Sequence, residues 1–373
     1  MNTQQIHQLI SPAPGTQREL LSLHYGTPGA GPKAYIQASL HADELPGMLV
    51  AHHLRNKLDA LEAAGQVAGE VVLVPMANPI GLAQHHLHSP MGRFEFTSGQ
   101  NFNRHYPDQI DAVAEAVVNE LTQDAARNVR VLRTALKKAV SNSRVETELQ
   151  SLRRTLMALS CDADVVLDLH CDAQAVLHLY TETPCAALCE PLAQYLGSRV
   201  TLLAQDSGDN PFDEACSQVW WKWARHFGNR FPIPQACLAV TVELRGFVEV
   251  SHELARADAQ NIIDYLGHRG IIAGAPKPIP AAVGDARPLA GSMPIQSPTA
   301  GLLVFQREPG ETVQAGDVLA HVIDPISNAV TELKSPVDGL LYARDNLRFA
   351  TAGMRVAKVA GKEALRSGKL LGF

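Results

Sequence analysis

Residues 34–47 read AYIQASLHADELPG, and the segments on either side of this stretch decide the fold. The run Ala34–Leu40 is almost wholly apolar, as expected of a strand that helices cover on both faces. Residues 48–65 (MLVAHHLRNKLDALEAAG) place apolar side chains at helical spacing and end on Gly65, a helix stop signal. A second apolar run, Val71–Met76, completes a strand–helix–strand unit. This alternation predicts an α/β fold.

Two later strands and a helical insertion extend this unit. Val165–Leu169 (VVLDL) and Ala239–Leu244 (AVTVEL) are again apolar runs of strand length. Between about residues 109 and 160, Gly and Pro are scarce and apolar residues recur every three or four positions, which predicts two or three inserted helices. These helices could shape one wall of a site or only cover the sheet. We therefore expect a mixed or parallel sheet with helices on both faces.

The composition changes near residue 274, where a run rich in Pro, Ala and Gly (GAPKPIPAAVGDARPLAG, 274–291) indicates a linker or extended crossover. Beyond it, short apolar runs alternate with Pro-Gly, Ala-Gly and Asp-Gly turns, which is typical of a compact all-β module. We predict an α/β domain at residues 1–275 and a β barrel-sandwich module at 290–373.

Two segments of that module, PGETVQAGDVL (309–319) and SPVDGLL (335–341), resemble the biotinyl/lipoyl carrier fold. Such carriers present a lysine at the hairpin tip between these segments. Here the tip reads DPISNAV (324–330), and Lys334 lies later, on the strand that enters the second segment. We therefore expect the module to act as a lid or an assembly surface and not as a carrier.

Charge and cysteine content argue against several classes of function. The chain has 373 residues and a formal net charge of −6, without a polybasic arm for nucleic acid. We find no apolar run long enough for a membrane span, and the first 15 residues lack the pattern of a secretory signal. None of the six cysteines forms a CxxC pair, which favours reduced, buried thiols. We expect a cytoplasmic protein without nucleic-acid or membrane partners, and homo-oligomer formation stays open.

A first group of polar residues lies where two of the predicted strands end. His41 and Glu44 are three positions apart, so both can reach one ion, and zinc sites combine three such ligands with an open position. In open α/β sheets, sites lie at the carboxyl ends of strands, and His170 ends the strand VVLDLH. Asp168 shares a strand face with His170 and is a candidate to orient it. Neighbouring Cys171 is better read as a small buried side chain than as a metal thiolate.

A second group supplies charges for a substrate and for proton transfer. The segment NFNRHYPD (101–108) is too polar for a core strand, whereas the guanidinium of Arg104 and the amide of Asn103 suit a substrate carboxylate. Glu243 ends an apolar strand, where an unpaired carboxylate is costly unless it has a function or a partner. It is either a general base or the ion-pair partner of Arg245, and Arg245 is in turn a candidate substrate-binding residue.

In this order, the motifs resemble the zinc carboxypeptidase-like superfamily and most of all its succinylglutamate desuccinylase/aspartoacylase branch. They are HADE (41–44), ANPIG (77–81), NFNR (101–104), DLH (168–170) and TVELRG (241–246). The resemblance covers most of residues 30–270, and the C-terminal β module also fits that branch. It implies a zinc carboxypeptidase-like fold.

The resemblance also implies roles for individual residues. One zinc ion per chain would be bound by His41, Glu44 and His170, and Glu243 would be the general base and then the general acid. Asn103 and Arg104 would hold the substrate carboxylate. Arg93, the only arginine between ANPIG and NFNR, would polarise the scissile carbonyl.

Two departures from the family pattern bear on the substrate. Glu44 and His170 are 126 positions apart, which is long for the small deacylases. The segment before NFNR is also long and contains His85, His86 and His88, which are either extra ligands or part of a solvated loop. Both departures alter the rim of the pocket more than its chemistry.

The resulting prediction is a zinc-dependent amide hydrolase, a deacylase acting on an N-acyl amino acid or a similar small carboxylate. A metallocarboxypeptidase that trims peptide C-termini would need the same zinc ligands and the same arginine. A third reading, a non-catalytic binding or assembly protein, would make the β module the working part.

Overall fold

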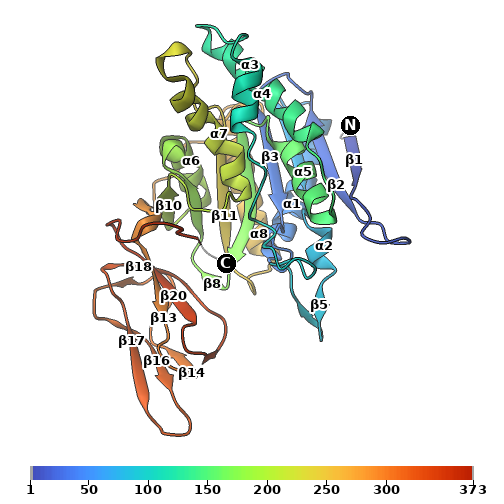
Figure 1. Cartoon of the computed structure of the whole chain (residues 1–373). Coiled ribbons are helices and arrows are strands. Elements are labelled where there is room, and N and C mark those ends of the chain that lie inside the picture. The colour runs from blue at the N-terminus through green and yellow to red at the C-terminus, as the bar shows by residue number, and fades with distance from the viewer. Residues whose placement is uncertain (1–2, 372–373) are drawn as a thin grey trace.

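The computed structural model describes residues 3–371 and places a small β module against one end of a large mixed sheet (Figure 1). The sheet has nine strands in the order β1-β2-β4-β3-β7-β11-β9-β10-β12. Their bounds are β1 Thr3–Gln8, β2 Glu19–Gly26, β3 Lys33–Ala38, β4 Glu70–Val74, β7 Val165–Asp172, β9 His178–Glu182, β10 Val200–Ala204, β11 Leu238–Gly246 and β12 Asp285–Pro288. The central strands β4, β3, β7 and β11 are parallel, whereas β9 runs antiparallel to β11. The expected mixed sheet is confirmed.

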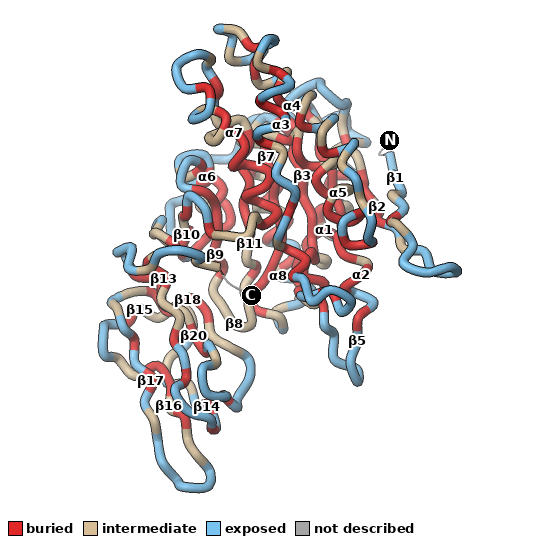
Figure 2. Tube along the Cα trace, viewed as in Figure 1, coloured by how far each residue is buried: buried red, intermediate tan, exposed pale blue. Residues whose placement is uncertain are grey.

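Helices cover both faces of this sheet, so its central strands are buried along their length (Figure 2). One face packs against α1 (Pro46–Ala63), α6 (Ala186–Leu196) and α8 (His252–His268). The other packs against α3 (Ile110–Val117), α4 (Ala125–Asn142), α5 (Glu148–Ser160) and α7 (Phe212–Phe227). Burial on both faces explains why these strands are largely apolar and do not alternate between polar and apolar residues. No helix within residues 3–371 is both long enough and apolar enough to cross a membrane.

The insertion predicted at 109–160 forms three helices, α3, α4 and α5. Asp124 caps α4, and Thr147 and Gln150 form a capping box at the start of α5, which explains where both helices begin. The helices cover the sheet and also brace a loop, because the buried Arg153 donates to the carbonyl oxygen of Asn101 at 3.0 Å. The insertion therefore stabilises the backbone of the NFNR segment through Arg153 of α5.

The C-terminal module consists of two antiparallel sheets around its own apolar cluster. Its strands are β13 Ser292–Gln296, β14 Gly301–Phe305, β15 Thr312–Val313, β16 Val318–Ile323, β17 Val330–Lys334, β18 Gly339–Arg344, β19 Phe349–Ala350 and β20 Arg355–Ala360. The short strand β8 (Gln174–Ala175), two residues after β7, pairs with β18 of the module. The module is thus attached directly beyond β7, the strand that contains DLH.

The segment that we interpreted as a linker is partly structured. Asp285–Pro288 forms β12 and pairs in parallel with β10. An extended chain at this position covers the open edge of β10, which would otherwise expose unpaired backbone groups. Pro288 is tolerated because β12 is itself the edge strand of the sheet.

Candidate active site

The HADE motif forms a tight turn directly after β3. Ser39 has a positive φ of 60°, its hydroxyl donates to the carbonyl oxygen of Glu44 at 3.0 Å, and the Glu44 N–H donates to the carbonyl oxygen of His41. The backbone of Gly92 packs against this turn so closely that a Cβ there would lie 2.2 Å from the nitrogen of Asp43. This packing holds the turn in one conformation and directs the first and last side chains of the motif to the same side.

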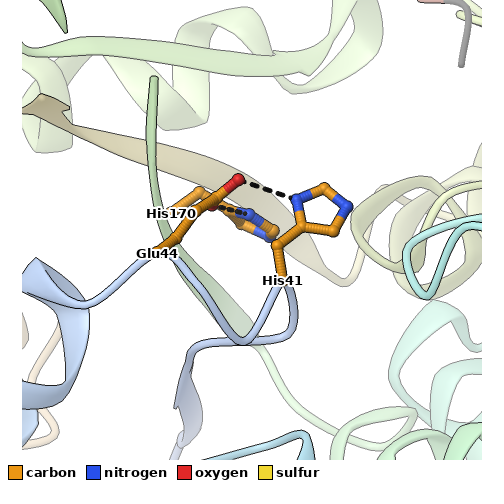
Figure 3. Close-up of side chains that lie close together, drawn as sticks. All are labelled: His41, Glu44 and His170. Carbon is orange, nitrogen blue, oxygen red and sulfur yellow. Dashed lines mark hydrogen bonds and ion pairs between the residues drawn. The ribbon is translucent and has the colours of Figure 1, made fainter. Parts of the chain in front are cut away.

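His170 joins these side chains because β7 lies beside β3 in the sheet, with Leu169 in register with Ala38. The Nδ1 atoms of His41 and His170 lie 2.9 Å and 2.6 Å from the two carboxylate oxygens of Glu44 (Figure 3). One ligand atom from each residue lies within 4.8 Å of the other two, and the three residues are 2–4% exposed. The structure therefore brings the three predicted ligands together around one point.

The opposite nitrogen of each ring contacts a buried polar side chain. His41 Nε2 lies 2.9 Å from Asn101 Oδ1, and His170 Nε2 lies 2.9 Å from Asp168 Oδ2. The second contact is an ion pair in which both side chains are buried. Asp168 is itself held by the amide of Gln37 at 2.9 Å. Acceptor oxygens at Nε2 favour the tautomer that has its proton on Nε2, so that Nδ1 has a lone pair available for a metal ion. Metal-binding histidines are commonly oriented in this way.

The charges of this group favour a cation at its centre. Burial would raise the pKa of Glu44, but the two neighbouring histidines hold it well below its ordinary value. Burial would lower the pKa of His170, but Asp168 and Glu44 together raise it well above its ordinary value. Two carboxylates around a buried imidazole thus stabilise positive charge, which a divalent metal ion would supply better than a proton.

The three side chains open onto a cavity of about 210 Å³. Arg93 lies at its mouth, where Nη1 donates to Glu44 Oε1 at 3.1 Å and lies 3.0 Å from His41 Nδ1. Asn103 and Arg104 also line the cavity. The side-chain oxygen of Asn103 accepts the N–H of Phe212 at the start of α7, which leaves its amide nitrogen for a ligand.

Glu243 lies beside His170, with which it pairs in register across β11 and β7. Burial and the nearby Glu44 raise the pKa of its carboxyl to about 8. Among the described residues, its Oε2 atom has no hydrogen-bond partner even though the atom is buried. This is the expected state of a carboxyl group that exchanges protons near neutral pH.

The structure does not place Arg245 in the cavity. Its guanidinium forms an ion pair with Asp258 of α8 and not with Glu243. The reason is an irregularity in β11 between Glu243 and Gly246, where Arg245 has a positive φ of 67° and turns away from the site. Neither expected role of Arg245, as a partner of Glu243 or as a substrate-binding residue, agrees with this position.

The alternative ligands considered from the sequence lie outside the triad. Cys171 is buried, its N–H donates to Glu44 Oε2 at 3.1 Å, and burial raises the pKa of its thiol. His85 and His86 form strand β5 (His85–His86), which pairs with β6 (Ser89–Pro90) in an exposed hairpin that includes His88. The hairpin is therefore a solvated loop.

The C-terminal part of the chain and the segment around the start of α7 also contribute residues to the cavity, and these were not anticipated from the sequence. Lys358 of β20 and Leu371 reach it from the C-terminal part of the chain, and Lys358 forms an ion pair with Asp172. Ser207, Asp213 and Glu214 come from the segment around the start of α7. Acidic residues are common in the first turn of a helix, so Asp213 and Glu214 did not indicate a site in the sequence. Lys358 does not belong to a recognisable sequence motif, so it was not predicted either.

The chain has clear relatives of known structure. A family model for the succinylglutamate desuccinylase/aspartoacylase catalytic domain matches residues 30–269. A member of that family from Shewanella amazonensis SB2B is 27% identical over 97% of this chain and 99% of its own, with a TM-score of 0.84. Another, from Shewanella frigidimarina NCIMB 400, is 26% identical over 96% of this chain and 97% of its own, with a TM-score of 0.85.

More distant structures share the fold. The ectoine utilization protein EutE (DoeB) from Ruegeria pomeroyi, solved with its product bound, is 18% identical over 96% of this chain and 95% of its own, with a TM-score of 0.68. No curated protein matches the chain.

Proposed function

The chain belongs to the succinylglutamate desuccinylase/aspartoacylase family, and we propose that it is a zinc-dependent deacylase that hydrolyses the amide bond of an N-acyl amino acid or a similar small carboxylate. The observation that carries the proposal is the orientation of the two histidines. Both Nδ1 atoms face Glu44, while both Nε2 atoms face buried polar partners. Such a set suits one zinc ion per chain, held by His41, Glu44 and His170.

Zinc in a site of this kind supplies Lewis-acid chemistry, lowering the pKa of water and polarising the amide carbonyl. Glu243 takes a proton from the attacking water and returns it to the leaving amine, and its raised pKa suits both transfers. Arg93, whose Nη1 already faces the ligand group, donates to the carbonyl oxygen as negative charge develops there. Arg104 and the amide of Asn103 orient the substrate through its carboxylate.

The size and closure of the cavity favour a small substrate. A cavity of about 210 Å³ is below the usual range for drug-sized ligands, roughly 300–1,000 Å³. Lys358 and Leu371 form part of its wall, so the C-terminal part of the chain restricts access for a long peptide. These features support deacylation over the trimming of peptide C-termini, which would need an open groove.

The test uses the Glu243→Gln variant of the zinc-loaded protein. Zinc content and the release of amine from N-acetyl and N-succinyl amino acids are measured together. We expect unchanged zinc and a loss of turnover of about 10²–10⁴-fold, since Gln preserves the shape of the side chain but cannot carry the proton. Glu253→Gln, at an exposed position of α8, is the matched control.

Three outcomes would contradict parts of the proposal. Turnover in Glu243→Gln within tenfold of the wild type would remove Glu243 from the mechanism. Cleavage of peptides but not of N-acyl amino acids would assign the chain to the carboxypeptidases. Failure of the wild-type protein to bind zinc would favour a non-catalytic binding protein.

A further inference from the structure

Three polar residues of the cavity have no part in the proposed hydrolysis. Asp213 and Glu214 lie in the first turn of α7, and Ser207 lies in the loop before it. Acidic residues are common at helix starts, where they are usually solvated and imply no function. Here they are 6% and 5% exposed and line the same cavity as the candidate metal ligands.

These carboxylates lack a positive partner. Glu214 Oε1 accepts the N–H of Ser207 at 2.9 Å, but within residues 3–371 Glu214 Oε2 and the hydroxyl of Ser207 are buried without a well-formed hydrogen bond. No ion pair joins Asp213 or Glu214 to any residue in that range, Arg104 included. Burial, together with neighbouring carboxylates, raises the pKa of Asp213 to about 6 and that of Glu214 to about 7. A buried carboxylate in this state favours a cation.

Two of the cations that line the cavity are already paired with carboxylates. Arg93 pairs with Glu44, and Lys358 pairs with Asp172. Arg104 is left as the one unmatched cation that lines the described cavity, close to the two carboxylates of α7. When a substrate carboxylate takes up the charge of Arg104, the two carboxylates keep a surplus of negative charge that the protein does not neutralise.

A metal ion is a poorer occupant of this position than an organic cation. The group of His41, Glu44 and His170 is the one set of three potential ligands that the described residues bring within range of a single ion. An ammonium group, in contrast, has three donors for Glu214 Oε2, the Asp213 carboxylate and the Ser207 hydroxyl. It is also small enough for a cavity of about 210 Å³.

We propose that Asp213, Glu214 and Ser207 form a subsite for an ammonium group of the substrate, so that the preferred substrate is an N-acylated diamino acid. Its carboxylate binds Arg104, its free ammonium binds Glu214, and its acylated nitrogen lies at the metal centre. Hydrolysis adds one water across the amide bond and releases the acyl group as a carboxylate and the free diamino acid. This inference rests on the proposed deacylase function and specifies its substrate.

The experiment compares substrates that differ only in the ammonium group. The zinc-loaded, full-length protein is given Nα-acetylornithine, Nδ-acetylornithine and Nα-acetylnorvaline, which has the same carbon chain without the second nitrogen. We expect kcat/KM for one of the ornithine isomers to exceed that for acetylnorvaline by about ten- to a hundredfold, the contribution of a charge-assisted hydrogen bond. The Glu214→Gln variant should reduce this ratio at least about tenfold.

A matched control separates substrate recognition from folding. Glu190→Gln, at an exposed position of α6, should leave both the ratio and the rates unchanged. Acetylnorvaline turnover equal to that of both ornithine isomers would overturn the ammonium subsite and leave the deacylase proposal standing. An equal loss for all substrates in Glu214→Gln, with the ratio intact, would also overturn it. If the wild-type protein hydrolyses none of the three or any other N-acyl amino acid, the proposed function itself is wrong.

Discussion

Asp168 is the residue whose replacement tests the metal centre most directly without removing a ligand. It is fully buried, its Oδ2 lies 2.9 Å from His170 Nε2, and its Oδ1 accepts from Gln37 at 2.9 Å. In Asp168→Asn the amide has one oxygen for two donors. If that oxygen keeps its hydrogen bond with Gln37, the NH₂ group of the new side chain would face the Nε2–H of His170. His170 then has no negatively charged neighbour at Nε2, and the tautomer with the proton on Nε2 is no longer favoured.

We expect the dissociation constant for zinc to rise about 10- to 100-fold in Asp168→Asn, the usual effect of losing such a partner and equal to about 1.4–2.7 kcal/mol. The assay is competition for zinc with a chromophoric chelator near pH 7.5, with circular dichroism to show that the fold is kept. The control is Asp162→Asn, because Asp162 also forms ion pairs but lies just before β7, at the opposite end of that strand. Equal zinc affinity in Asp168→Asn, Asp162→Asn and the wild type would refute this account of the site.

Two further predictions concern charges outside the ligand set. Burial raises the pKa of Glu243 to about 8, while the charge of Lys358 lowers that pKa. Lys358→Met should therefore move the acidic limb of the kcat/KM–pH profile to higher pH by up to about one unit, and Lys358→Arg should restore the wild-type profile. An unchanged acidic limb in Lys358→Met would limit Lys358 to a structural contact with Asp172. Burial also raises the pKa of Glu182 from 4.5 to about 8, so its stabilising effect is complete below about pH 4.5 and is lost as pH rises towards 8. Glu182→Gln should therefore increase the free energy of unfolding relative to the wild type at pH 8.5–9 but not at pH 5. The expected increase is on the order of 2 kcal/mol, and the pKa difference sets an upper limit of about 5 kcal/mol. The same difference in unfolding free energy between variant and wild type at both pH values, measured by denaturant unfolding, would contradict this prediction.

The central strands β3, β4, β7 and β11 were predictable because local pattern and burial agree along them. Strands that helices cover on both faces read as nearly continuous apolar runs, so Ala34–Leu40 and Val165–Leu169 stood out as strands. The helix expected after the first of them is observed as α1. The linker was harder to interpret, since an edge strand such as β12 needs neither an apolar run nor alternation.

The candidate ligands were also predictable, for a topological reason. The strands β3 and β7 are parallel neighbours, so polar residues placed just beyond both of them meet at one edge of the sheet. His41, Glu44 and His170 therefore converge once β3 and β7 lie side by side. Within the HADE turn, the short spacing between His41 and Glu44 directs both side chains to the same side.

What the sequence determined by itself about this protein was the α/β fold, the family resemblance and the candidate metal ligands, all of which follow from local pattern or from adjacent parallel strands. Only the tertiary structure decided the surroundings of that centre. Arg245 turns away at an irregularity in β11, whereas Lys358 enters the cavity because β8 pairs with β18. The two acids at the start of α7 became notable only once packing had buried them without a cation. The physical reason is that burial and charge pairing depend on contacts between distant segments, which no local spacing records.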